Sequence, residues 1–170
     1  MSEQPEAASS ERLLAFLDLA TFEDGAAIRG GCLVTDAITR PLEFRVSGAV
    51  RPTNLQKKLY GELLLEYVCT DLLGLPLLQA LEARPELVLV REAEFLKLRP
   101  RLEIPVLWTR ATADGQYVLQ AHPGFEKEAE LGRDALPKRL RGRFILEPFQ
   151  RVRNALEEAH TLKVGENRTA

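Results

Sequence analysis

The first fifty residues alternate between apolar runs and turn signals, which predicts three short strands. Leu13 to Phe22 is apolar and leads into Asp24-Gly25, a dipeptide typical of tight hairpin turns. A second apolar run covers Ala26 to Thr35. Residues 42–46 then alternate between apolar and polar side chains, which is the pattern of a half-buried strand. We therefore expect a three-stranded antiparallel meander over residues 12–50.

A long helix follows the meander. Thr53-Asn54-Leu55-Gln56 matches a capping box, in which the threonine hydroxyl and the glutamine side chain satisfy the first free amides of a helix. The helix is expected over residues 54–73, ending at Gly74-Leu75-Pro76. Apolar side chains occur all round it, as in helices that are buried on two sides. Either it is central, with an exposed window at Glu62 and Glu66, or one face packs on the sheet and the other on a partner subunit. The partner face would contain Tyr60, Leu64, Tyr67 and Val68.

The rest of the chain mixes one buried strand with shorter elements. Leu87 to Val90 is apolar throughout, which indicates a strand in the middle of an α/β sheet. A short helix is expected at 92–98, and a strand pair near residues 102–120. Three helical segments follow Pro123, at 125–131, 134–140 and 148–162.

This order of elements predicts a mixed α/β fold with C-terminal helices. We expect one domain over residues 12–164, in which 12–122 form the sheet with its central helix and 123–164 form the C-terminal helices. The polar ends of the chain, residues 1–11 and 165–170, are expected to be disordered tails.

Composition agrees with one domain that has a core. Among 170 residues, 45% are hydrophobic and 28% charged, with a net charge of -2, which excludes collagen, coiled coil and wholesale disorder. The acidic N-terminus does not resemble a secretory signal, and the longest apolar stretch is interrupted by charged residues, glycine and proline. We expect a cytoplasmic protein without a membrane partner. Cys32 and Cys69 lie in apolar surroundings, typical of buried, reduced thiols.

Two acids occupy positions that fit a metal-binding or ligand-binding role. Asp18 stands in the middle of the first apolar strand, and burial of an unpaired acid is costly. It either faces solvent, pairs with an arginine of an adjacent strand (Arg29 or Arg45), or serves as a metal ligand. Glu92 directly follows the buried strand, at the sheet edge where ligands bind in α/β proteins. Its alternative role is an acid in the first turn of a helix, which the helix dipole favours.

The element order and the acid positions resemble the ribonuclease H-like superfamily over about residues 12–109. Two features depart from that pattern: a glutamate, not an aspartate, follows the fourth strand, and the strand pair near 102–120 is additional. The resemblance implies Mg²⁺-dependent phosphodiester hydrolysis, in which acids hold the ions that orient water and stabilise the leaving oxygen. The implied catalytic residues are Asp18, Glu62 or Glu66, Glu92, and Glu157 or Glu158, with Asp18, Glu62 and Glu92 as metal ligands.

A basic segment lies near the C-terminus. Residues 133–153 carry seven basic and two acidic side chains, whereas residues 1–50 carry eight acids and four arginines. Because Phe144 and Phe149 lie within it, the segment fits contacts with nucleic-acid phosphates. Alternatively, it balances the acidic half within the fold or across a dimer. The candidate nucleic-acid-binding residues are Lys138, Arg139, Arg141, Arg143 and Arg151.

Two functions remain open at the level of sequence. One is a metal-dependent, nuclease-like or nucleic-acid-binding domain. The other is a non-catalytic α/β subunit that forms a homo-oligomer, or binds a protein partner, through the 54–73 helix. The chain has no P-loop, dinucleotide-binding or nucleophile-elbow motif. Carboxylates that converge on one point would favour the metal site, whereas a carboxylate paired with an arginine would favour the second function.

Overall fold

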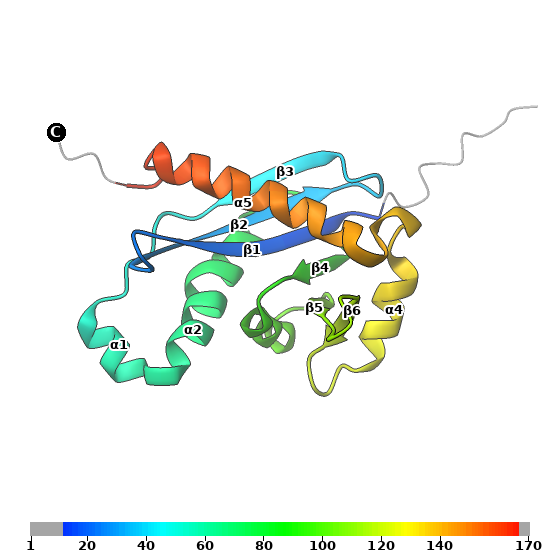
Figure 1. Ribbon diagram of the computed structural model, residues 1–170, viewed down its shortest axis with the longest axis horizontal. Helices are drawn as coiled ribbons and strands as arrows, with labels where there is room; N and C mark the ends of the chain where they lie inside the picture. Colours follow the sequence, from blue (N-terminus) through cyan, green and yellow to red (C-terminus); the bar gives the residue numbers. More distant parts are fainter. Residues whose placement is uncertain (1–11, 167–170) are drawn as a thin grey trace, which may run out of the picture.

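A computed structural model describes residues 12–166, which form a six-stranded mixed sheet with helices on both faces (Figure 1). The strand order is β3-β2-β1-β4-β5-β6. β1, β4 and β5 are parallel, whereas β2, β3 and β6 each pair antiparallel with their neighbour. The strands are β1 (Leu14–Phe22), β2 (Ala27–Thr35), β3 (Pro41–Val46), β4 (Leu87–Val90), β5 (Val106–Ala111) and β6 (Tyr117–Ala121).

The expected meander and the central strand are confirmed. β1 pairs with β2 over its whole length, and the turn between them places Asp24 and Gly25 at φ 56° and 89°. Asp24 and Gly25 favour this backbone conformation because aspartate tolerates it and glycine has no side chain to obstruct it. β4 is fully buried between β1 and β5, which explains its unbroken apolar sequence.

One face of the sheet is covered by a helical region that begins with the expected capping box. The Thr53 side chain accepts from the amide of Gln56, and the Gln56 side chain accepts from the amide of Thr53. The helix was expected to end at Leu73, but the chain continues through Gly74 because Pro76 falls in a first helical turn, where its missing N–H is tolerated. The segments are α1 (Asn54–Tyr60), a 3₁₀ turn (Gly61–Leu63), α2 (Leu64–Tyr67), a π-helical stretch (Val68–Gly74) and α3 (Leu75–Ala80).

The other face carries the C-terminal helices, of which α5 lies along β1 and β2 (Figure 1). A separate helix was expected at 134–140, but only a 3₁₀ turn forms there, because Pro137 disfavours the helical conformation of Leu136 before it. The helical segments on this side are α4 (Lys127–Ala135), two 3₁₀ turns (Lys138–Leu140 and Gly142–Ile145) and α5 (Leu146–Thr161). A further 3₁₀ segment, Ala93–Arg101, follows β4.

The core consists of two clusters, one on each face of the sheet. Leu14 and Phe16 of β1 face α5, where the Phe16 ring meets the Phe149 ring edge to face at 5.4 Å. Ala15 and Leu17 face the other way, toward the π-helical stretch. This alternation places the next residue on the α5 face, Asp18, beneath α5.

The helical region Asn54–Ala80 is long and apolar enough to cross a membrane by length and composition. One third of its most apolar window is buried inside the protein, and Val68, Cys69 and Leu73 belong to the core. Core helices of globular proteins have the same composition.

The structure describes two residues of the predicted tails, 165 and 166. Residues 1–11 and 167–170 lie outside the described residues. Residues 165 and 166 were expected in the disordered tail, but Glu166 pairs with Arg51 at 2.7 Å.

Candidate functional site

The carboxyl end of β4 lies between the middle of β1 and the middle of β5. The last register pairs of β4 align Leu17, Val90 and Trp108, so Asp18, Arg91 and Thr109 each come one residue later, with Arg91 beyond the end of β4; these three positions are here called the Asp18 row. The row belongs to the face covered by α5, whose Arg153 reaches Asp18. This is the edge of the sheet at which α/β proteins bind ligands.

The Asp18 carboxylate is buried and engaged by an arginine. It is 1% exposed; Arg153 Nε donates to Oδ2 at 2.9 Å, and the amide of Leu19 donates to Oδ1 at 2.9 Å. Burial raises the pKa of Asp18, and the hydrogen bond and charge of Arg153 act against that increase. Of the three alternatives for Asp18, the structure has the arginine pair, but the partner belongs to α5 and is neither Arg29 nor Arg45.

The two arginines expected near Asp18 have other partners. Arg29 is completely buried and lies opposite Ala20, beyond Asp18 along β1. Its Nε donates to His160 Nδ1 at 2.9 Å and its Nη1 donates to the carbonyl of Val164 at 2.7 Å. Arg29 thus holds the segment after α5 against the sheet. Arg45 pairs with Glu43 of its own strand, at 2.7 Å.

Glu92 lies close enough to Asp18 for their charges to interact. Burial raises the pKa of Glu92, and the negative charges of Glu94 and Asp18 raise it further. Two of the predicted acids therefore lie near the carboxyl end of β4, Asp18 on the middle of β1 and Glu92 just after β4. Like charges at this edge are costly unless cations compensate them, and Arg153 and Arg91 supply positive charge there.

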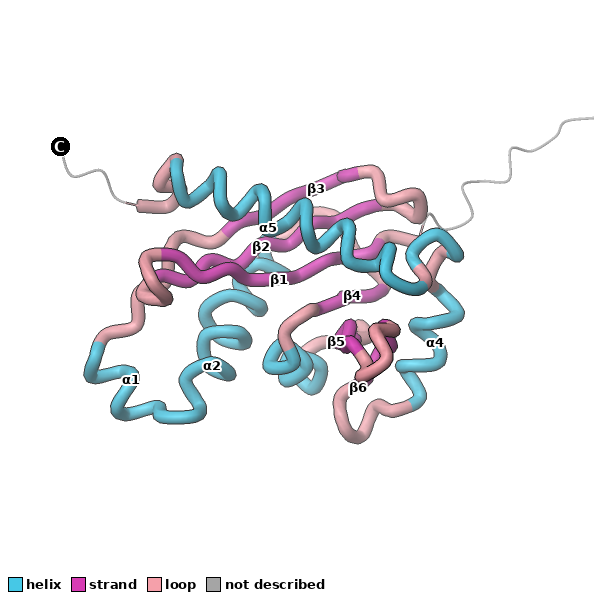
Figure 2. Tube along the Cα trace, in the orientation of Figure 1, coloured by secondary structure: helices cyan, strands magenta, loops and turns pink. Residues whose placement is uncertain are grey.

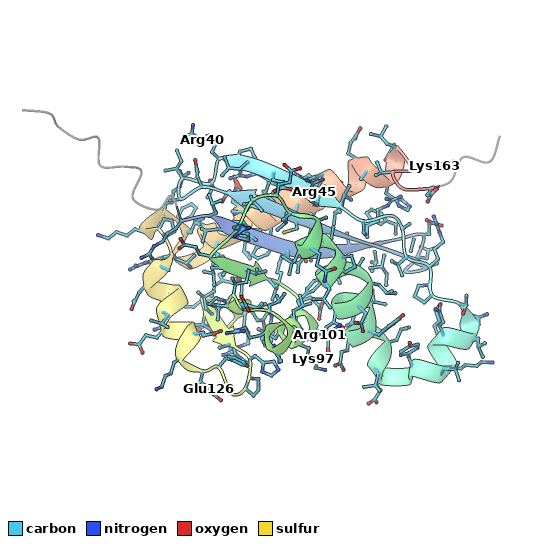
Figure 3. The ribbon with its side chains drawn as sticks, turned by 180° about the vertical axis from the view of Figure 1, so that it is seen from behind. Arg40, Arg45, Lys97, Arg101, Glu126 and Lys163 are labelled. Atoms are coloured by element: carbon cyan, nitrogen blue, oxygen red, sulfur yellow. The ribbon has the colours of Figure 1, made fainter. Side chains whose placement is uncertain are left out.

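The remaining predicted acids do not join this pair. Glu66 Oε2 pairs with Lys97 Nζ at 3.1 Å, on the face of the sheet opposite α5, where Lys97 lies beside Arg101 on the 93–101 segment (Figure 3). Glu62 is exposed on the 3₁₀ turn. Glu157 and Glu158 are exposed on α5. Within residues 12–166, no three His, Cys, Asp or Glu side chains come together in a group that could hold a metal ion.

The donor set at Asp18 does not fit the Mg²⁺ that the superfamily resemblance implies. Mg²⁺ binds carboxylate oxygens and water in near-octahedral geometry. Here each oxygen of Asp18 accepts from an N–H group, and the nearest charged neighbours include the guanidinium of Arg153. Asp18 and Arg153 form an ion pair that belongs to the packing of α5 on the sheet. We therefore derive no metal-dependent step from these residues.

A second candidate site is a pocket of about 390 Å³ at the start of α5. Its walls combine the turn between β2 and β3 with the 138–141 segment and the first turn of α5. The Phe144 ring at its edge is 67% exposed. Three of the five basic residues predicted to bind nucleic acid line this pocket with exposed side chains: Lys138, Arg139 and Arg141.

The basic residues of this pocket differ in whether their side chains already have partners within the protein. Arg151 is fixed: it pairs with Glu147 at 2.6 Å and donates to the carbonyl and hydroxyl oxygens of Thr39 at 2.6 and 2.9 Å. Arg139 donates one N–H to a carbonyl of the β2–β3 turn. Within residues 12–166, Lys138 and Arg141 make no side-chain hydrogen bond or ion pair. Arg151 therefore builds the wall, whereas Lys138 and Arg141 present unpaired charge.

Only part of the expected partner face of the long helix is internal. Val68, which we expected at an interface, is fully buried in the core, and Leu64 packs partly against that core. Tyr60 and Tyr67 stack on each other with ring centroids 4.5 Å apart. The exposed apolar side chains of this region are different ones: Leu55, Leu59, Leu63 and Leu65.

No protein-family model matches the chain, and no curated protein matches it. Among solved structures, endonuclease V from Streptomyces avermitilis is similar, with 14% sequence identity, coverage of 87% of this chain and 82% of that one, and a TM-score of 0.52. Endonuclease V from Bacillus subtilis has 18% identity, with 61% of this chain covered and a TM-score of 0.43. Endonuclease V from Ciona intestinalis, in complex with a 23mer DNA, has 8% identity, with 79% covered and a TM-score of 0.34. The chain spans 46% of the Bacillus enzyme and 63% of the Ciona enzyme.

These comparisons bear on the fold. The likeness to the Streptomyces structure extends over most of both chains and concerns the fold alone. The fold-level resemblance inferred from element order is in line with this likeness. The chain has a mixed α/β fold similar to that of the Streptomyces endonuclease V.

Proposed function

We propose that this chain is a nucleic-acid-binding domain that binds single strands through the pocket at the start of α5. Phosphates contact Lys138, Arg139 and Arg141, and an unpaired base stacks on Phe144. The observation that carries the proposal is the convergence of these basic side chains on one pocket beside an exposed aromatic ring.

Charge supports the binding of a phosphate backbone. Lys138 and Arg141 are exposed and have no anionic partner within residues 12–166, so binding a phosphate breaks no ion pair of the described structure. Basic side chains that contact phosphates release counterions, which supplies most of the affinity for nucleic acid without sequence preference. Arg151, held by Glu147, keeps the wall of the pocket in place.

Phe144 supports a single strand in preference to a duplex. A phenylalanine ring that is 67% exposed next to basic side chains is a stacking platform, because every unpaired base offers a flat face to it. Stacking on an aromatic ring contributes about 1–3 kcal/mol per base. Bases inside a duplex are stacked on each other and do not offer this contact.

The contacts of Asp18 support a binding function without hydrolysis at this position. Asp18 is committed to Arg153, and the helical acids lie elsewhere. We therefore propose that Asp18 stabilises the fold and does not position a metal ion. The similarity to a nuclease fold then concerns the scaffold, on which many different functions occur.

The test is fluorescence anisotropy with a labelled single-stranded oligonucleotide over a series of salt concentrations. We expect K138A/R141A to weaken binding equally for all base compositions and to reduce the salt slope by about 1.4, since each phosphate contact on a single strand contributes about 0.7. The matched control is R84A/K127A, which removes two exposed basic residues outside the pocket. Absence of salt-dependent binding by the wild-type protein, or an equal loss in the control variant, would overturn the proposal.

A further inference from the structure

Residues 54–67, here called the helical arm, project from the body of the protein below the sheet (Figure 1 and Figure 2). None of the residues in α1, the 3₁₀ turn or α2 is buried. The arm bends at Gly61, whose φ of 53° ends α1. A helix of seven residues is marginal in water without packing.

Three leucines of the arm are more than half exposed. Leu55, Leu59 and Leu63 are 65%, 73% and 62% exposed. The first two lie four residues apart on α1 and therefore on the same side of that helix. Single exposed leucines are common on protein surfaces, but a group of three on one projecting element is typical of a contact surface.

The charges of the arm show which partner fits. Lys57 and Lys58 lie before Leu59, and Glu62 lies after it. Within residues 12–166 none of these three side chains forms an ion pair. Two copies of the arm placed antiparallel would bring the basic half of each against the acidic half of the other. An anionic membrane surface would favour basic residues and be repelled by Glu62.

We propose that the helical arm is a homodimer contact, in which two copies pack antiparallel about a two-fold axis near Leu59. Leu59 of each copy meets its counterpart, and Leu55 of one copy lies near Leu63 of the other. Lys58 of each copy then lies beside Glu62 of its partner. Such a contact uses the same patch on both subunits and closes at two copies. Because the patch is short, the dimer dissociates at micromolar concentration.

The first measurement is sedimentation velocity over a range of protein concentrations. We expect the wild-type protein to dimerise and L59E to weaken dimerisation at least about tenfold, since a buried charge replaces an apolar contact. The matched control is L131E, because Leu131 on α4 is 65% exposed and lies outside the arm. A wild-type protein that stays monomeric at its highest soluble concentration would overturn the proposal, as would equal weakening by L131E.

A charge exchange tests the antiparallel arrangement. K58E alone places four negative side chains at the two-fold axis of a homodimer, and E62K alone places four positive ones, so each variant alone should dimerise at least about tenfold more weakly than the wild type. A mixture of the two variants should recover dimers near wild-type affinity, because each negative arm then faces a positive one. Charges within one chain are unchanged by mixing, so recovery reports contact between copies. Failure of the mixture to recover dimers contradicts this arrangement.

Discussion

Replacement of Arg153 by methionine removes the side chain that holds the Asp18 carboxylate, and we expect it to lower the free energy of unfolding. Asp18 is 1% exposed, and without Arg153 its Oδ2 has no hydrogen-bond donor among the described residues. Methionine preserves much of the volume of the arginine stem, so the variant isolates the loss of charge and hydrogen bond.

The expected loss of stability depends on how deeply each partner of the Asp18–Arg153 ion pair is buried. Removing one partner of a fully buried ion pair costs about 3–5 kcal/mol. The Arg153 side chain is 42% exposed, so water screens part of this interaction, and we expect a loss of about 2 kcal/mol at neutral pH. D18N should cost about 1 kcal/mol, since it removes one hydrogen bond and also the buried charge. The double variant D18N/R153M should be more stable than R153M.

The loss of unfolding free energy in R153M relative to the wild type, here called its deficit, should depend on pH. Burial already raises the pKa of Asp18 in the folded protein, and loss of the positive Arg153 charge raises it further. A carboxyl whose pKa is higher in the folded than in the unfolded state stabilises the fold when it is protonated. The deficit of R153M is therefore full above the folded-state pKa and decreases as the pH falls through it. The part of the deficit that depends on charge is lost below the folded-state pKa of Asp18 in the wild type, where the carboxyl is protonated in both proteins, because the unfolded-state pKa is the same for both and cancels.

Urea unfolding followed by the fluorescence of Trp108, the one tryptophan of the chain, measures these differences. R153M, D18N and the double variant form a cycle that isolates the pair. If R153M remains within about 0.5 kcal/mol of the wild type at neutral pH, or if D18N fails to rescue it, Asp18 is not held by this ion pair as we describe.

Three further predictions concern packing and the buried charged and thiol groups. In Gly132→Ala, the added Cβ would overlap the end of the buried Leu107 side chain, so either that side chain or α4 must shift at a cost of about 1–3 kcal/mol, measurable by thermal unfolding; an unchanged Tm would contradict this packing. Arg29→Met leaves the segment after α5 without its buried donors, and limited proteolysis should cut that segment faster than in the wild type; equal rates would show that Arg29 does not hold it. Burial raises the pKa of Cys32 to about 12 and also raises that of Cys69, so both thiols should resist a disulfide reagent at pH 8 until urea is added; fast labelling of the native protein would refute their burial.

Much of the fold was predictable because local signals and burial agree. The Asp24-Gly25 turn, the capping box at Thr53 and the apolar run Leu87–Val90 each specify a local structure that the sheet then uses. Prediction failed where a proline signal had two interpretations. Pro76 was taken to end a helix, but it lies in the first turn of α3; Pro137 ended a helical pattern that was expected to continue.

The candidate site was less predictable because it depends on which elements meet across the sheet. Local sequence places Glu92 directly after β4, where burial and the charges of Glu94 and Asp18 raise its pKa. It does not reveal that Arg153, 135 residues away, covers Asp18. Nor does it show that the helix bends at Gly61, which carries Glu62 out on a projecting arm. The basic segment was easier to predict, because its residues are close together in the chain and converge locally.

We propose that the domain binds single strands through its basic pocket and does not cleave them through Asp18. The most direct measurement incubates a labelled single-stranded oligonucleotide with wild-type protein, D18N and K138A/R141A, in Mg²⁺ and in EDTA. Anisotropy measures binding, and a denaturing gel measures strand length. We predict salt-sensitive binding by wild type and D18N of equal affinity in both buffers, weaker binding by K138A/R141A, and an intact strand throughout. Mg²⁺-dependent cleavage by the wild type that D18N abolishes would contradict the account.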